Sequence, residues 1–135
     1  MTRALLKEAK FENCNTTHLN LNGADLTRVT FNNSNLTHAV LINALVSGTT
    51  WHNTDMQEVD MSGLDLSLKM LSKLNFSRAK LRGVKMFGTE LKGTDLTLAD
   101  LSGAELDSAK MSEVILTGAN MTGAKLTTAD CTLGN

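Results

Sequence analysis

The sequence predicts a solenoid whose chain turns a corner every five residues, and three periodic features support this prediction. An apolar residue, here called the centre, returns every five positions, with 26 centres from Leu6 to Cys131 in unbroken phase and only Thr16 not apolar. The position two before the centre is alanine twelve times, and nine of the ten glycines stand two positions after a centre. A period of five fits neither an α-helix nor a strand, whereas a coil with a corner every five residues keeps every centre inside.

Many of the repeats share one local sequence. They include Ala24-Asp25-Leu26, Ala99-Asp100-Leu101, Ala104-Glu105-Leu106 and Ala119-Asn120-Met121. They resemble the Ala-(Asp/Asn)-Leu-X-X motif of the pentapeptide-repeat proteins over roughly residues 9–133. The resemblance implies an all-β fold, a right-handed quadrilateral β-helix with four five-residue sides per coil and about six coils of 20 residues.

The residues just before the centres test a repeat of twenty. Residues twenty apart should stack on adjacent coils about 4.8 Å apart, where opposite charges attract. Three such columns alternate in sign, namely Asp60, Lys80, Asp100; Asp65, Lys85, Glu105, Lys125; and Glu90, Lys110, Asp130. Asn13, Asn33 and Asn53 should form an amide ladder, and Phe11, Phe31 and Trp51 a column of stacked rings. We therefore expect these columns to fix the register of the coils.

The first residues depart from the motif. Residues 1–10 contain good helix formers after Thr2, and we interpret them as an N-terminal cap with one helical turn, followed by the β-helix over residues 11–135. The alternative is a frayed first coil with Leu6 as its centre.

Two groups of apolar side chains should point outward and contact a protein partner. They are Val40, Ile42 and Leu45 in one group and Leu68 and Phe87 in the other. The alternative for the first group is a strand surface that is only lightly exposed.

Residues 67–75 are the weakest repeats. Lys69 stands at a position that should hold a small inward residue, so we expect a local bulge or rearranged corner that frees it. The surrounding cations predict a basic belt around more than one side, formed by Lys69, Lys73, Arg78, Arg82 and Lys92. The favoured alternative to a binding belt is that nearby lysines, such as Lys80 and Lys85, serve only in the charge columns.

The last coil has no following cap in this sequence. Leu126, Ala129, Cys131 and Leu133 should form an open edge, which predicts either a homodimer joined end to end or a chain that is a piece of something longer. His18, His38 and Glu58 share a column, and we expect them to be exposed corner residues and not a metal site.

Composition argues against several classes of function. The formal net charge of −1 argues against nucleic-acid binding, and no apolar run is long enough to cross a membrane. No signal peptide is visible, and the two cysteines fall on inward positions far apart, which favours a reducing, cytoplasmic location. We find no phosphate loop, Cys-x-x-Cys pair or His-Glu-x-x-His motif, and expect no catalytic residue, metal or cofactor.

The function predicted from these features is that of a non-enzymatic scaffold that binds a protein partner, of unknown identity, through its flat β faces. The resemblance also implies an alternative, a DNA-mimicking inhibitor of DNA gyrase of the quinolone-resistance type. The near-neutral charge and the lack of an inserted loop weigh against it. A third hypothesis is the repeat region of a secreted bacterial effector.

Overall fold

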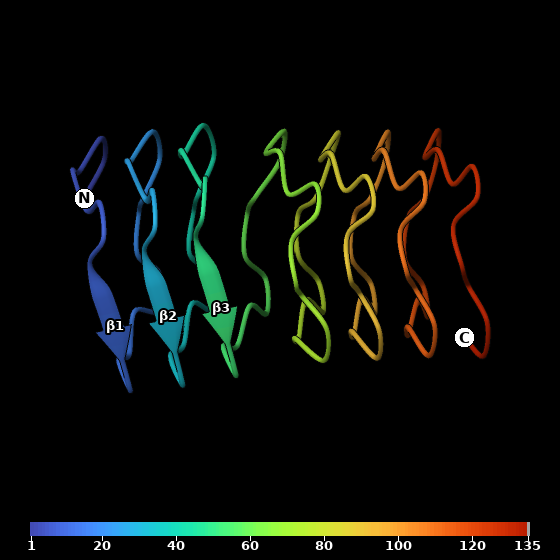
Figure 1. Ribbon diagram of the computed structural model, residues 1–135, viewed down its shortest axis with the longest axis horizontal. Coiled ribbons are helices and arrows are strands. Elements are labelled where there is room, and N and C mark those ends of the chain that lie inside the picture. Colours follow the sequence, from blue (N-terminus) through green and yellow to red (C-terminus); the bar gives the residue numbers. More distant parts are fainter. Residues whose placement is uncertain (135) are drawn as a thin grey trace.

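The computed structural model describes residues 1–134, and in it the chain winds into a single rod of stacked coils (Figure 1). Strands β1 (Lys10–Glu12), β2 (Thr30–Asn32) and β3 (Thr50–His52) pair in parallel in the order β1-β2-β3. Every other bridge also joins residues twenty apart, up to Lys110 and Asp130. The described part of the chain has no helix, and the fold is a right-handed quadrilateral β-helix, as the sequence predicts.

The corners explain the spacing of the glycines. Each corner residue, two positions after a centre, has a φ in the left-handed region, between 48° at Asn53 and 72° at Gly63. Glycine adopts this region without steric cost, which is why most glycines stand there. Gly88 and Gly118 also leave room for a neighbour, because a Cβ would lie 2.9 Å from the Leu68 side chain and 2.7 Å from that of Leu98.

The interior is a column of centres closed by the small residues two positions before them. Leucine, methionine and phenylalanine centres are almost fully buried from Leu21 to Met111. Where the small residue is polar, its hydroxyl donates to a carbonyl 23 positions earlier. Thr49 donates to the Leu26 oxygen at 2.7 Å, and Thr89 to the Leu66 oxygen at 2.9 Å. These bonds tie adjacent coils together from inside.

The expected charge columns are present. Lys80 Nζ lies 4.0 Å from Asp60 Oδ2, Lys110 pairs with Glu90, and Lys125 pairs with Glu105 at 3.0 Å. Asn53 Nδ2 donates to Asn33 Oδ1 at 2.9 Å, and Phe11 and Phe31 stack with ring centroids 4.9 Å apart. These contacts confirm the register of twenty. Such exposed pairs are well solvated and contribute little, so the register depends mainly on the backbone ladder.

The N-terminal residues follow the same path. No helical turn forms over residues 2–10, since Leu5 bridges Asp25 and the Leu6 amide donates to the Asp25 oxygen at 3.0 Å. Leu6 and Phe11 remain half-buried because no coil covers them from the N-terminal side among the described residues.

Several aspartates just before a centre stabilise the turn that follows them. The pKa values of Asp25, Asp65 and Asp130 are lowered because each carboxylate accepts bonds from the hydroxyl and amide two residues on. The pKa of Asp100 is lowered first by the Arg82 guanidinium and then by Ser102.

Acid should therefore destabilise the fold. These folded-state pKa values lie below that of an unfolded aspartate, about 3.9, so their stabilisation is complete above that pH and is lost as pH falls through the folded values. We expect the urea midpoint to hold between about pH 7 and 5 and to fall below about pH 4. The triple variant D25N/D65N/D130N retains an acceptor oxygen but cannot be protonated, so its midpoint should fall less. An equal fall in the variant would contradict this prediction.

Candidate interaction site, an opening between two coils

The backbone ladder is interrupted at one place, between residues 43–54 and 62–75. Between Leu6 and Met111 the amide of a centre outside the paired strands ordinarily donates to the carbonyl nineteen positions on, as from Leu41 to Asp60 at 2.8 Å. Val46 and Trp51 make no such bond. The amides that lack their ladder bond are Asn43, Val46, Gly48, Trp51 and Asn53 on one edge and Asp65, Met70 and Asn75 on the other. Figure 1 shows the wider interval between β3 and the coil that follows it.

The opening lies where the chain changes from one kind of corner to another. In the coils of β1 to β3 the strand is followed by an asparagine and then by Cys14, Ser34 or Thr54. The Ser34 and Thr54 hydroxyls donate to the Phe11 and Phe31 carbonyls at 3.1 and 3.3 Å.

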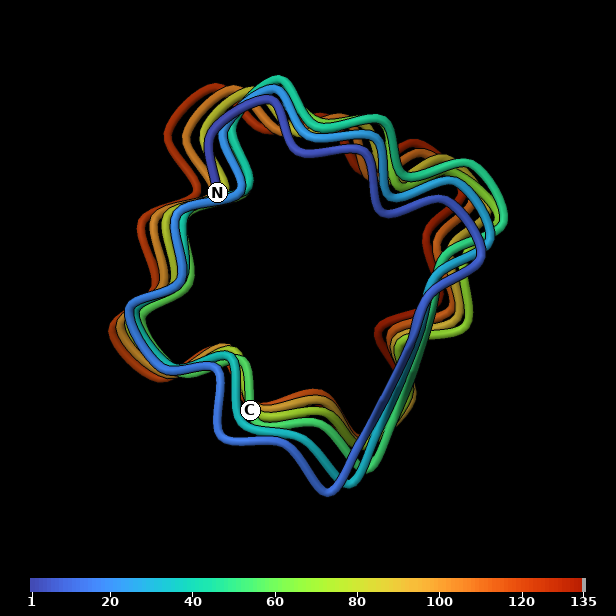
Figure 2. The same ribbon diagram turned by 90° about the vertical axis from the view of Figure 1, so that its left-hand side faces the viewer.

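Later coils close the same side with a backbone turn. The Thr94 amide donates to the Leu91 oxygen at 3.0 Å. Figure 2 shows the consequence, because the blue to green coils take a straighter path on this side than the yellow to red ones. Two coils that follow different paths cannot superpose, so the ladder between them opens.

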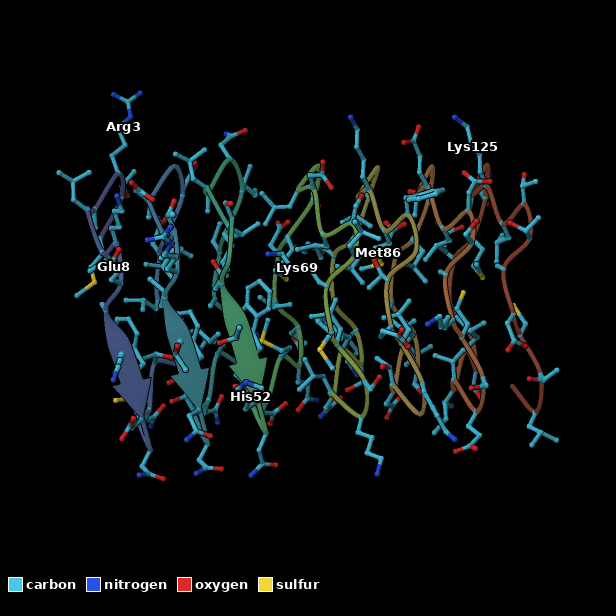
Figure 3. All side chains as sticks on the ribbon, viewed as in Figure 1. Arg3, Glu8, His52, Lys69, Met86 and Lys125 are labelled. Carbon is cyan, nitrogen blue, oxygen red and sulfur yellow. The ribbon has the colours of Figure 1, made fainter. Side chains whose placement is uncertain are left out.

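Lys69 lies inside this opening. It shares a column with Thr49 and Thr89, and like them it donates to the carbonyl 23 positions earlier, from Nζ to the Val46 oxygen at 2.8 Å. Burial lowers the pKa of its ammonium group, an effect partly opposed by the Asp65 carboxylate. A lysine is much longer than a threonine, so the same bond spans a larger gap between coils. Figure 3 shows Lys69 in the middle of the rod, beside the coil that contains His52.

The prediction of a bulge or a rearranged corner that frees Lys69 is wrong. The phase is unbroken, because Met70 bridges Glu90 and the Lys69 amide donates to the Leu66 oxygen at 3.2 Å within its own turn. Lys69 is half-buried instead of freed. The fold accommodates the lysine by separating two coils, which leaves the spacing of the repeats intact.

Two cavities follow the opening. The first has a volume of about 410 Å³ and is lined by Leu45, Val46, Asp65, Ser67 and Lys69 among others. The second, of about 210 Å³, is lined by Trp51, His52, Leu68, Lys69 and Met70 among others. Trp51 is only 3% exposed, and its Nε1–H makes no hydrogen bond in the described structure. A buried N–H donor without an acceptor destabilises a protein by about 1–3 kcal/mol, so an acceptor that reached this indole would be stabilised there.

Exposed apolar side chains lie at and beside the second cavity. Leu68, 73% exposed, and Met70, 78% exposed, line it, and Phe87 on the next coil is 53% exposed; we call these three residues the apolar lip. Leu68 and Phe87 lie on neighbouring coils, since the Leu68 amide donates to the Phe87 oxygen at 2.9 Å. The lip and the opening therefore form one continuous region.

The structure separates the other predicted site residues. Leu45 lines the first cavity, whereas Val40 and Ile42 are half-buried and line neither cavity. In the basic belt, Arg82 pairs with Asp100 and Lys92 with Glu113 at 3.2 Å. Lys73 lines a third cavity of about 260 Å³ along the same opening, beside Asn53 and Asn75.

The residues of the open C-terminal edge lie at the end of the rod. Leu126 and Ala129 are half-buried, Cys131 is exposed and Leu133 is 86% exposed. The role predicted for them in end-to-end association stays a prediction.

Sequence reasoning flagged Lys69 but missed Trp51 and Met70 as site residues. The signal for the opening is the change from Trp51-His-Asn-Thr to Leu71-Ser-Lys-Leu at matching positions twenty residues apart.

His18 and His38 stack with ring centroids 4.6 Å apart, and His38 Nδ1 lies 3.2 Å from Glu58 Oε2. Within residues 1–134 no cluster of three side chains suited to a metal ion is found, nor any helix able to cross a membrane.

Comparisons with known proteins agree with this geometry. A family model described as a pentapeptide repeat region matches residues 4–71, and a second, for pentapeptide repeats in eight copies, matches residues 70–97 and 94–130. Among solved structures, the pentapeptide repeat protein Rfr23 from the cyanobacterium Cyanothece 51142 is 19% identical, with a TM-score of 0.58 and coverage of 90% of both chains.

A second solved structure is trypsin-treated QnrB1 R167E, a plasmid-mediated fluoroquinolone resistance protein. It is 18% identical to this chain, with a TM-score of 0.74 over 99% of this chain and 68% of its own. These likenesses are evidence for the fold alone. No curated protein sequence matches the chain.

Proposed function

The chain belongs to the pentapeptide repeat family, and we propose that it is a non-enzymatic scaffold that binds a protein partner at the apolar lip beside the opening. The observation that supports this most is the exposure of Leu68 and Met70, which line a cavity, and of Phe87 on the coil next to Leu68. Contiguous exposed apolar side chains next to a cavity are typical of interaction sites.

Other outward columns carry compensated charge, such as Lys110 with Glu90 and Lys125 with Glu105. Exposed pairs of this kind are well solvated and contribute little to association. Other exposed apolar side chains, such as Leu98 and Ile115, line neither of the first two cavities. Contact of a partner with the lip would remove three large apolar side chains from water beside the opening.

The DNA-mimic alternative receives less support. A surface that imitates DNA needs rows of unpaired acids, and here Asp60, Glu90, Asp100 and Glu105 each pair with a lysine or an arginine. The shape shared with QnrB1 does not supply that charge pattern. A supercoiling assay with purified gyrase tests the alternative directly, and inhibition at micromolar protein would favour it over the scaffold.

Partner capture tests the proposal. The double variant L68S/F87S should lose at least about tenfold of the partner retained by the immobilised wild type, because two central apolar contacts are removed. Leu98 is the matched control, since it is 50% exposed and covers Gly118 as Leu68 covers Gly88. L98S should retain the partner. Equal capture by wild type and L68S/F87S, measured by quantitative mass spectrometry, would contradict the proposal.

A further inference from the structure

We propose that the opening between residues 43–54 and 62–75 accepts an extended peptide segment of a partner protein as an additional strand. The segment would run parallel to the coils and pair with both edges at once. This inference rests on the proposed function, because it states how the scaffold holds its partner.

The two edges present the groups that a strand requires. The amides of Val46, Gly48 and Trp51 face the gap from one coil, and those of Asp65 and Met70 from the next, all without ladder bonds. The corresponding carbonyls include Ala44 and Thr49 on one edge and Asp65, Ser67 and Met70 on the other. Val46 and Trp51 are buried, and the backbone donors of buried residues are almost always paired in native proteins. A parallel strand presents alternating backbone donors and acceptors to both sides, so it can pair with the whole row of groups on each edge. A small ligand could pair with only a few of them.

Two side chains in the opening favour an inserted strand that carries an acceptor oxygen. Trp51 Nε1–H is a buried donor with no partner, and Lys69 Nζ makes a single protein hydrogen bond although an ammonium group has three donors. An inserted strand would therefore present an acceptor oxygen toward the interior. On its other face, alternate side chains would meet the apolar lip.

The coils on each side can receive a strand without unfolding. Within its own coil the Thr49 amide still donates to the Val46 oxygen at 3.2 Å, and the Leu64 amide to the Met61 oxygen at 3.1 Å. The neighbouring side stays joined by the bond from the Met56 amide to the Asn75 oxygen at 3.0 Å, so it can act as a hinge. Residues 1–134 all lie in the rod, so the described chain supplies no loose segment of its own.

Amide exchange with a defined peptide tests the proposal. The probe is a synthetic peptide with the sequence of residues 83–95, GVKMFGTELKGTD, because it has the corners and inward Thr89 of a matching coil. In the free protein the amides of Val46, Trp51 and Met70 should exchange at least about tenfold faster than ladder amides such as that of Leu81. Saturating peptide should slow their exchange by a similar factor and shift the emission of Trp51, the sole tryptophan.

Matched controls separate strand pairing from other binding. The same peptide with alternate N-methylated amides cannot donate to either edge and should give no protection. The variant K69T, which should narrow the opening, is expected to bind the peptide at least about tenfold more weakly, whereas K7T, at an exposed lysine far from it, should bind as wild type. Slow exchange in the free protein, no protection by the probe, or equal protection by the N-methylated peptide would overturn the proposal. If the probe fails while L68S/F87S still loses the natural partner, only strand insertion is refuted and the scaffold function stands.

Discussion

Replacing Lys69 by threonine is expected to stabilise the protein by about 1–3 kcal/mol, measured as a rise in the urea midpoint. A threonine here should donate to the Val46 oxygen, as Thr49 and Thr89 donate to theirs in the same column. The change removes a half-buried ammonium group and shortens the distance over which the coils are bridged. The amides of Val46 and Asp65 could then regain their ladder bonds, each contributing about 0.5–1.5 kcal/mol.

A second substitution at the same position isolates the cause. Lys69→Met retains the length of the side chain but cannot donate to the Val46 oxygen, so it should not stabilise the protein. The exposed variant K7T should leave the midpoint unchanged within about 0.5 kcal/mol. A K69T protein that is less stable than wild type would show that the lysine does not hold the coils apart.

Phe76→Ala should produce the largest loss of stability, about 3–5 kcal/mol. Phe76 is fully buried and is among the largest interior side chains. By register it lies between Met56 and Leu96, on the side where the ladder continues past the opening through the bond from Met56 to Asn75. Its removal leaves a cavity in a region where the backbone ladder still joins the two halves of the rod.

The loss should be uneven along the rod. In a solenoid each coil contacts only its neighbours, so stability is roughly a sum of local terms. Amide exchange should therefore accelerate more near Lys80 and Asp100, within two coils of Phe76, than near Asp25. The exposed control Phe87→Ala should change stability by no more than about 0.5 kcal/mol. Uniform acceleration over residues 1–134 would contradict this expectation.

The sequence predicts the fold because the fold repeats. Each coil repeats the same pattern, so the register can be tested many times along the chain. For example, Asp60, Lys80 and Asp100 form a column of alternating charge only if the repeat is twenty residues. The glycine spacing likewise follows from left-handed corners, such as those at Gly63 and Gly88. Because so many repeats follow the same pattern, the sequence is consistent with few other architectures.

The opening could not be read from the period, because the phase of the repeat does not change there. Two corner geometries meet there, between Trp51 and Leu71, and the long side chain of Lys69 spans the gap between the coils, whereas each corner taken alone is ordinary. Periodicity located the unusual lysine but implied a bulge, since it treats one coil at a time. The separation of coils depends on whether two backbone paths superpose, which is a property of neighbours and not of a single repeat.

The four-sided register also limits how a gene for this protein can change in length. The sides differ, since the β1 to β3 side has large ring centres and a distinct corner. Loss or duplication of five codons would rotate every later residue by a quarter turn and place unlike sides over one another. Loss or duplication of twenty codons would leave each column aligned, so length variants that survive selection should differ by whole coils.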